Sequence, residues 1–218
     1  MHFEESKHPR DEKGQFSDKG ESDYPAEINK RIRWAKDNGI ELPLNSDGSV
    51  DDLRLQKLYA EEKQHAEALS DFISRVKRGE AKAGEIFELG NVSSRTKADI
   101  EYLTGQKLNA TKHVIGADEI RHIEKGHGEQ GKSDRSMSTI QDYRQISDVL
   151  SNYNRLEWAR NKKGKIDTTN AYLDKSGRPA RLIKFTKEYA NNEQYVIEAV
   201  SDTKGRLHII SSYKKGRI

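Results

Sequence analysis

Two histidines and a serine–lysine pair are the residues whose types and spacing could do chemistry. His122 and His127 lie five residues apart in "IRHIEKGHG", and Ser211 and Lys214 follow some 80 residues later. Histidine titrates near pH ~6.5, so an imidazole can accept or donate a proton at neutral pH. Hydroxyl and ammonium groups can stabilise charge on a phosphate. These groups could cleave RNA without a metal, one taking a proton from the ribose 2′-OH and another protonating the departing 5′-oxygen.

The spacing of the two histidines bears on which kind of site they could form. Five residues correspond to about 140° around a helix, so both side chains share a site only if the helix ends between them. Gly126 could end it and let the chain turn His127 back toward His122. Alternatively, His127 complements the helix dipole and His122 is a surface residue. A helical zinc pair has four-residue spacing with Glu after the first His, where Ile123 stands, so we expect no metal or other cofactor.

The last predicted strand, residues 207–213, carries the hydroxyls. Strict alternation puts Leu207, Ile209, Ser211 and Tyr213 on one face and His208, Ile210, Ser212 and Lys214 on the other. If Ile209 faces the helices, Ser211 lies at the end of the same row, near the histidines. Arg181 and Lys184 add cationic groups, and Tyr213 is one of several tyrosines that could stack bases. The same residues are also typical of an ordinary strand end and an exposed sheet face.

Composition limits the class of protein. Of 218 residues 33% are hydrophobic and 34% charged, which favours one compact domain with polar extensions. The 39 basic and 36 acidic residues give a net charge of +3, which permits an anionic partner without requiring one. The absence of cysteine excludes disulfide frameworks and thiolate metal sites. No apolar run approaches the ~20 residues that span a bilayer, and the N-terminus has no hydrophobic signal region, so we expect no membrane association.

Three segments follow one another along the chain. Residues 1–24 are polar without an apolar period, and we expect a disordered tail. Residues 25–78 form a helical extension, with a short helix from Pro25 and a long charged helix over residues 51–78 that carries one thin apolar stripe. The long helix could pack by that stripe or pair with another chain. Residues 79–218 form the domain that holds the candidate chemistry.

Within this domain the helical signals come first. A helix ends at Gly105, another covers residues 118–125, and Ser138 with Gln141 indicates a capping box for a third. Strands follow at residues 156–160, 167–173, 180–187, 194–200 and 207–213, separated by short Asn-, Asp- and Gly-containing connectors. Short connectors favour antiparallel neighbours. We therefore predict an α+β fold, with N-terminal helices packed on a C-terminal antiparallel β-meander of four to five strands.

Four segments in order, "IRHIEKGHG", "DYRQISDVL", "YVIEAV" and "LHIISSYKKG", resemble the phage-associated Barnase–EndoU–colicin–RelE (BECR) nucleases over roughly residues 85–216. The resemblance implies an endoribonuclease that needs no metal and leaves a 2′,3′-cyclic phosphate. It implies that His122 and His127 are the acid/base pair and that Ser211 and Lys214 are the hydroxyl and cation of the final strand, with serine where the family prefers threonine. Arg181, Lys184 and Tyr213 are then expected to contact the substrate.

The same resemblance implies RNA as the partner, with tRNA among the candidates, in the host cytoplasm or in association with a virion. "HPRDEKGQF" near the N-terminus resembles a motif of phage structural proteins, and the helix over residues 51–78 could dock on such a protein or form a homodimer. Two alternatives stay open. One is a phage packaging-associated protein that binds nucleic acid without cleaving it, and the other is an ADP-ribosyltransferase toxin with Glu198 as catalytic acid.

Overall fold

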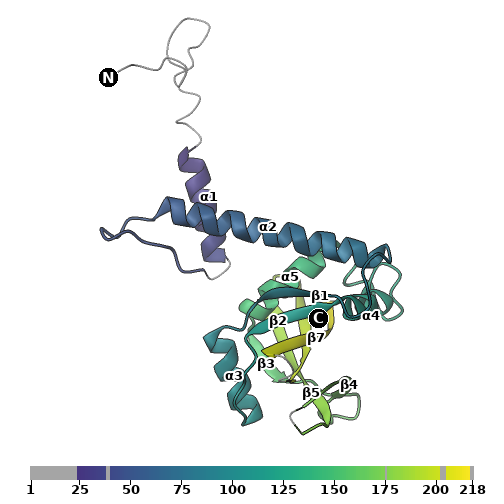
Figure 1. The fold of residues 1–218 in the computed structure, drawn as a ribbon. Coiled ribbons are helices and arrows are strands. Elements are labelled where there is room, and N and C mark those ends of the chain that lie inside the picture. The colour runs from purple at the N-terminus through teal and green to yellow at the C-terminus, as the bar shows by residue number, and fades with distance from the viewer. Residues whose placement is uncertain (1–23, 38–39, 175, 202–204, 217–218) are drawn as a thin grey trace, which may run out of the picture. The chain divides into compact units, whose positions relative to one another are not determined.

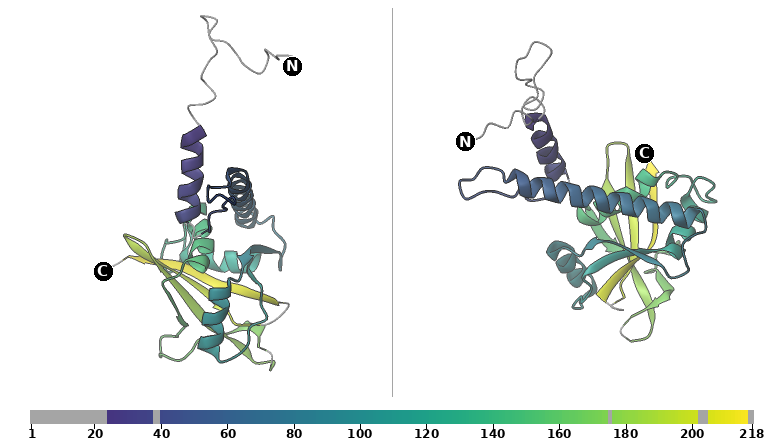
Figure 2. Two further views of the ribbon diagram at one scale, coloured as in Figure 1. Left: turned by 90° about the vertical axis from the view of Figure 1, so that its left-hand side faces the viewer. Right: turned by 45° about the horizontal axis from the view of Figure 1, so that its top comes forward.

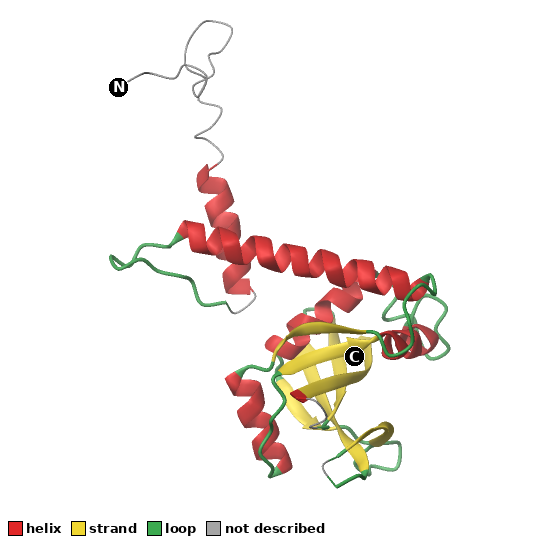
Figure 3. Ribbon diagram, in the orientation of Figure 1, coloured by secondary structure: helices red, strands yellow, loops and turns green. Residues whose placement is uncertain are grey.

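The computed structural model describes residues 24–37, 40–174, 176–201 and 205–216, so the predicted tail lies, except for its last residue, outside the described residues. The elements are α1 (Tyr24–Asp37), α2 (Asp52–Lys77), β1 (Ile86–Asn91), α3 (Ser94–Thr104), β2 (Lys112–Gly116), α4 (Ala117–His127), α5 (Ile140–Ser151), β3 (Arg155–Trp158), β4 (Thr168–Leu173), β5 (Pro179–Glu188), β6 (Asn192–Ala199) and β7 (Arg206–Gly216) (Figure 1, Figure 3). The chain divides into two compact units, residues 1–63 and 64–218, with the division inside α2.

The first unit holds α1 and the first half of α2. The Arg31 guanidinium lies 3.0 Å from the Asp52 carboxylate, and the rings of Trp34 and Tyr59 meet edge to face at 5.1 Å. Leu55 is fully buried. None of the helices in the described ranges is long and apolar enough to cross a membrane.

The second unit is built on one sheet with the order β1-β2-β7-β6-β5-β3, and β4 also pairs with β5. The strands β5, β6 and β7 form an antiparallel meander, as predicted. The remainder differs from the prediction: β3 and β4 both pair with β5, and β2 pairs in parallel with β7. Within the described residues the sheet is therefore a mixed one of seven strands. A parallel neighbour is possible because the chain between β2 and β7 is long, passing through α4, α5 and β3 to β6.

Most of the hydrophobic core lies on one side of this sheet, here called the helix face. The second half of α2 packs there with α4 and α5 against residues of the sheet such as Ile183, Phe185, Val196, Leu207 and Ile209. The other side, here called the outer face, carries a smaller cluster of Ala159, Ala180, Leu182 and Ala199, with Tyr172, Ile197 and Ile210 against it. Figure 2 shows the twisted sheet from two further directions. The α+β class is confirmed.

A β-bulge in β7 changes which residues share a face. Ile197 pairs with Ser211 but Glu198 pairs with Ile209, so Ile210 is an extra residue. Leu207 and Ile209 point to the helix face, and beyond the bulge Ser212 and Lys214 continue that row. Ser211 and Tyr213 therefore lie on the outer face. The strict alternation predicted from the sequence is wrong at this point, because a bulge shifts the register by one residue.

The helix α4 continues through Gly126 to His127, and the Gly128 N–H donates to the Glu124 carbonyl at 3.0 Å. The prediction that Gly126 ends this helix is wrong. On a continuous helix His122 and His127 diverge by about 140°. The next helix, α5, begins with a capping box formed by Thr139 and Asp142, one residue after the predicted one.

Two glycines allow the course of α4 to be tested. Gly126 has no positive φ and a methyl group added there would meet nothing within 4 Å, whereas Gly105 ends α3 in the left-handed conformation with φ 65°. Gly126→Ala should raise the free energy of unfolding by about 0.5–1 kcal/mol, because alanine loses less backbone entropy in a helix. The matched Gly105→Ala should lower it by about 1 kcal/mol, because alanine is strained in that conformation. Urea unfolding measures both, and equal destabilisation would contradict a continuous α4.

Candidate active site

The loop of residues 128–137 is folded back onto the end of α4. The backbone N–H groups of Lys132, Ser133 and Met137 donate to the carbonyls of Lys125, Gly126 and His127 at 3.0, 2.9 and 2.8 Å. These are carbonyls that a helix C-terminus otherwise leaves without partners. The loop is therefore held against the helix by backbone hydrogen bonds, and the fully buried Met137 side chain anchors its far end in the core.

Close packing in this loop requires glycine at position 131. A Cβ atom on Gly131 would lie 2.3 Å from the Asp134 carbonyl oxygen and 2.7 Å from that of Gly126. Both neighbours are backbone atoms that cannot rotate away. Any side chain here would push the loop off α4, and with it Asp134.

The His127 side chain is held by two contacts, one from this loop and one from β7. Its Nδ1 lies 2.8 Å from Oδ2 of Asp134, whose Oδ1 accepts the Ser136 backbone N–H at 2.9 Å. The imidazole also stacks on the Tyr213 ring, with 5.2 Å between centroids. Its side chain keeps 18% of its surface exposed. The ring is therefore fixed in orientation and still accessible.

The ionised carboxylate of Asp134 fixes the tautomer of His127. Burial raises the pKa of Asp134, but hydrogen bonds from Ser136 and His127 outweigh burial and leave the pKa below its ordinary value. The carboxylate is ionised at neutral pH and can only accept, so Nδ1 of His127 carries a proton. In the neutral imidazole Nε2 then keeps its lone pair, as a proton acceptor requires.

A row of rings on the outer face leads away from His127. Tyr213 stacks on Tyr195 with 5.0 Å between centroids. The Lys184 ammonium lies 5.3 Å from the Tyr195 centroid, and the Lys215 ammonium lies 5.9 Å from both tyrosine rings. Burial, and then the nearby Asp134 charge, raises the pKa of Tyr213, so its hydroxyl stays protonated. The imidazole thus borders an aromatic and cationic surface.

The structure does not bring His122 into contact with His127. His122 is exposed and lies three residues after Glu119, which accepts a hydrogen bond from the Tyr172 hydroxyl at 2.7 Å. Tyr172 packs on the outer face, so Glu119 marks the side of α4 that borders this face. Residues three apart lie on the same side of a helix. His122 therefore borders the outer face from the helix, and His127 borders it from the helix end.

The other predicted residues divide between the two faces. Ser211 is 9% exposed and lies on the outer face, two residues before Tyr213. Lys184 is on this face too, ion-paired with Glu157 at 2.9 Å. Arg181 lies on the opposite face, where its guanidinium covers the Trp158 ring at 4.4 Å.

Lys214 also lies on the helix face, away from His127. Its ammonium is 2.5 Å from the Asp142 carboxylate and 2.6 Å from the Gln145 side-chain oxygen, and its backbone N–H donates to the Ser136 hydroxyl at 2.9 Å. Burial raises the pKa of Asp142, but hydrogen bonds from Lys214 and Thr139 outweigh it and leave that pKa below its ordinary value. The Lys214 ammonium thus binds α5 to β7.

Sequence reasoning missed Asp134, Ser136 and Lys215, whereas Tyr195 is one of the tyrosines expected to stack bases. The signal for the first two is the short Asp-x-Ser pattern directly after the histidine motif, which is typical of a turn in which the aspartate accepts backbone hydrogen bonds. Glu198, named above for the transferase alternative, is fully buried on the helix face and lies 2.9 Å from Nδ1 of His113. Among the residues that the structure describes, no three or more His, Asp or Glu side chains cluster as metal ligands would.

Comparison with protein families gives one match. The family model described as phage-Barnase-EndoU-ColicinE5/D-RelE like nuclease 3 matches residues 90–217, which include α3, α4, α5 and the strands β2 to β7. Neither the curated proteins nor the solved structures give a match.

The hydrogen bond from His127 to Asp134 makes a spectroscopic prediction. In the wild-type chain at a pH where the ring is neutral, ¹⁵N–¹H correlation spectra of the imidazole should show the proton on Nδ1. Asp134→Ala removes the acceptor, so the proton should redistribute toward Nε2. His65 serves as an internal control, because its ring bonds the Glu88 carbonyl instead and should be unchanged. An unaltered His127 tautomer in Asp134→Ala would contradict the assignment.

Proposed function

The chain belongs to the phage-Barnase-EndoU-ColicinE5/D-RelE-like nuclease 3 family, and from this premise we propose that it is an endoribonuclease that needs no metal. In the proposed reaction the ribose 2′-oxygen bonds to the adjacent phosphorus, the bond from phosphorus to the 5′-oxygen breaks, and a 2′,3′-cyclic phosphate remains. The observation that carries the proposal is His127, an accessible imidazole whose Nδ1 is held by Asp134 and whose Nε2 has no hydrogen bond within the described part of the chain.

The proton transfers are assigned to the two histidines. Nε2 of His127 takes or returns one proton, and His122, on the α4 side that borders the outer face, is proposed to transfer the other to or from the substrate. Asp134 keeps the ring in one orientation and in the tautomer that carries the proton on Nδ1. Tyr213 supports the ring by stacking. We assign it no proton transfer, because its hydroxyl stays protonated and cannot act as a base.

The phosphate is proposed to lie over the outer face of β7. Ser211 and Lys215 share this face with Tyr213, and Lys184 adds a second cation from β5. Positioned cations stabilise charge that develops on phosphate oxygens in the transition state. We assign the cationic role to Lys215 and Lys184, and we assign Lys214 the task of fixing β7 against α5.

The structure bears differently on the two alternative functions, nucleic-acid binding without cleavage and ADP-ribosyl transfer. A domain that binds nucleic acid without cleaving it would use the same aromatic and cationic surface, so an activity measurement is needed to exclude it. The ADP-ribosyltransferase alternative needs an accessible Glu198, but this side chain is fully buried and paired with His113, and we do not propose it.

The nuclease assay uses purified full-length protein with labelled total RNA and tRNA in EDTA. We expect fragments that end in 2′,3′-cyclic phosphate, and we expect His127→Ala to lower the cleavage rate by about 10²–10⁴-fold, as loss of an acid/base group does. A single-stranded DNA of the same sequence should stay intact because it has no 2′-OH. Circular dichroism controls for folding. Cleavage that requires an added metal, or no cleavage at all, would sink the proposal.

His122 is tested separately, because it lies apart from His127. If it is the second proton-transfer group, His122→Ala should lower kcat by about 10²-fold or more and remove one limb of the pH–rate profile. The control variant is Lys162→Ala, which removes an exposed cation from the turn between β3 and β4 and should keep both limbs. A His122→Ala profile with both limbs intact would exclude His122 from proton transfer.

A further inference from the structure

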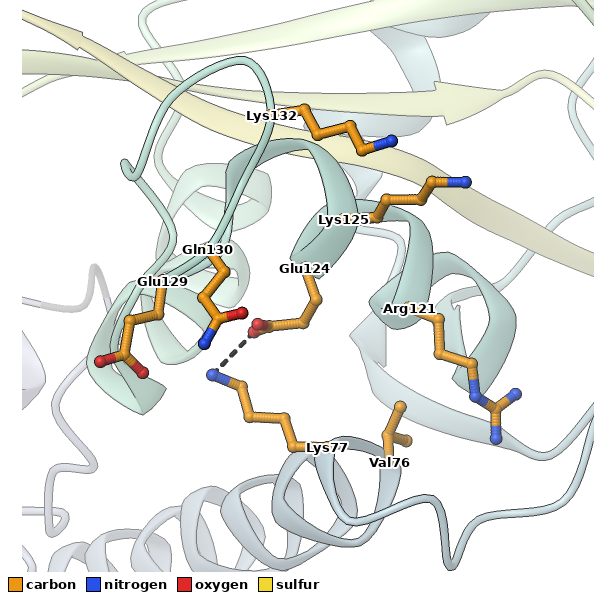
Figure 4. Close-up of a pocket in the computed structure, with 8 residues that line it drawn as sticks. All are labelled: Val76, Lys77, Arg121, Glu124, Lys125, Glu129, Gln130 and Lys132. Atoms are coloured by element: carbon orange, nitrogen blue, oxygen red, sulfur yellow. Dashed lines mark ion pairs between the residues drawn. The ribbon is translucent and has the colours of Figure 1, made fainter.

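A pocket of about 430 Å³ lies beside α4, on a different side of this helix from the proposed active site. It is lined by Val76, Lys77, Arg121, Glu124, Lys125, Glu129, Gln130 and Lys132 (Figure 4). Glu124 is five residues after Glu119, so the pocket wall lies about 140° around α4 from the side that borders the outer face. The loop of residues 128–137 contributes Glu129, Gln130 and Lys132 to the pocket lining, and its Asp134 holds His127.

Several charges of this pocket are satisfied internally. The Glu124 carboxylate lies 2.7 Å from the Lys77 ammonium and accepts the Tyr143 hydroxyl at 2.6 Å. The Arg121 guanidinium lies 2.7 Å from the Asp118 carboxylate and donates to the Ala81 carbonyl at 2.5 Å. These groups build the wall and leave little charge for a ligand.

Lys125 and Lys132 differ from these neighbours. Both are exposed, and within the described part of the chain neither ammonium takes part in an ion pair. The backbone N–H of Lys132 donates to the Lys125 carbonyl at 3.0 Å, which keeps the two residues side by side. Figure 4 shows both side chains extended toward the same side of the pocket. Two neighbouring cations that take part in no ion pair within the described residues can attract an anion.

We propose that Lys125 and Lys132 bind a backbone phosphate of the RNA strand outside the bond that is cleaved. This inference rests on the proposed function for the identity of the strand. His122 lies about one helical turn before Lys125. The exposed side of α4 between the outer face and the pocket therefore carries first the His122 imidazole and then the two lysines. A strand that crosses the outer face can continue over this side of the helix, and lysine binds phosphate as a point charge without strict geometry.

Counterion release gives the proposal a quantitative signature. Each single-strand phosphate contact contributes about 0.7 to the slope of log K against log salt concentration. Loss of both lysines should therefore reduce the slope by between about 0.7 and 1.4, depending on whether they share one phosphate or contact two. The effect should not depend on RNA sequence, because phosphate contacts carry no base information.

The test measures binding of a single-stranded RNA whose 2′-hydroxyls are all methylated, so that the proposed attack cannot occur. Full-length wild type, the Lys125→Ala/Lys132→Ala double variant and a Lys162→Ala/Lys163→Ala double variant are compared over a salt series. The control lysines are exposed in the turn between β3 and β4 and change the net charge equally. We expect the first variant to bind about tenfold more weakly with a smaller salt slope, and the control to match wild type. On cleavable RNA, KM should rise with kcat unchanged.

The outcomes separate this inference from the proposed function. Weaker binding with a smaller slope supports the lysine site even if wild type cleaves no RNA, in which case only the proposed function fails. Cleaving wild type with unchanged binding in the double variant overturns the lysine site and leaves the nuclease intact. Binding of poly-glutamate that is lost in the double variant, with RNA binding unchanged, would also overturn it and assign the pocket to an acidic protein.

Discussion

The capping of the last α4 carbonyls by the loop of residues 128–137 is the interaction on which the candidate site depends. The helix alone would leave these carbonyls without partners, and the loop alone has no regular structure to hold its shape. Joined, they place Asp134 against His127, the Ser136 hydroxyl against β7 and Met137 in the core. The orientation of the His127 imidazole therefore depends on main-chain hydrogen bonds that hold the loop, and these tolerate many surface substitutions but not a side chain at Gly131.

The bulge in β7 is the second constraint, because it sorts neighbouring residues onto different faces. Without the extra residue at Ile210, Ser211 and Tyr213 would point toward the helices and Lys214 toward the outer face. With it, Lys214 reaches Asp142 and fastens α5 to the sheet, while Tyr213 stacks on His127. One inserted residue thus lets a single strand serve both as a structural anchor and as the floor of the site.

The helices and strands were largely predictable from local signals, because caps, apolar periods and turn residues act within a few positions. The start of α5, the stop at Gly105 and the strands β5 to β7 lie within three residues of their predicted bounds. The pairing of β2 with β7 and the bulge at Ile210 depend on contacts between distant segments, which no local pattern encodes. Asp134 was missed for the same reason, because its role arises from the course of the loop after His127. Gly126 was predicted to end the helix, but α4 continues to His127 and its last carbonyls are capped by this loop.

The distribution of charge explains how a chain with a net charge of only +3 could bind a polyanion. Lys214 and Lys187 lie on the helix face, each paired with a carboxylate of α5, at 2.5 and 2.6 Å, and so point away from the proposed binding surface. Lys215, Lys125 and Lys132 have no ion pair among the described residues, and they lie beside the outer face and along α4. Because exposed charges farther apart than about 8 Å are largely screened at physiological salt, these few local cations, rather than the overall charge, would determine the electrostatic field at a bound strand. Binding should therefore respond to single substitutions along this path far more than to changes of net charge elsewhere.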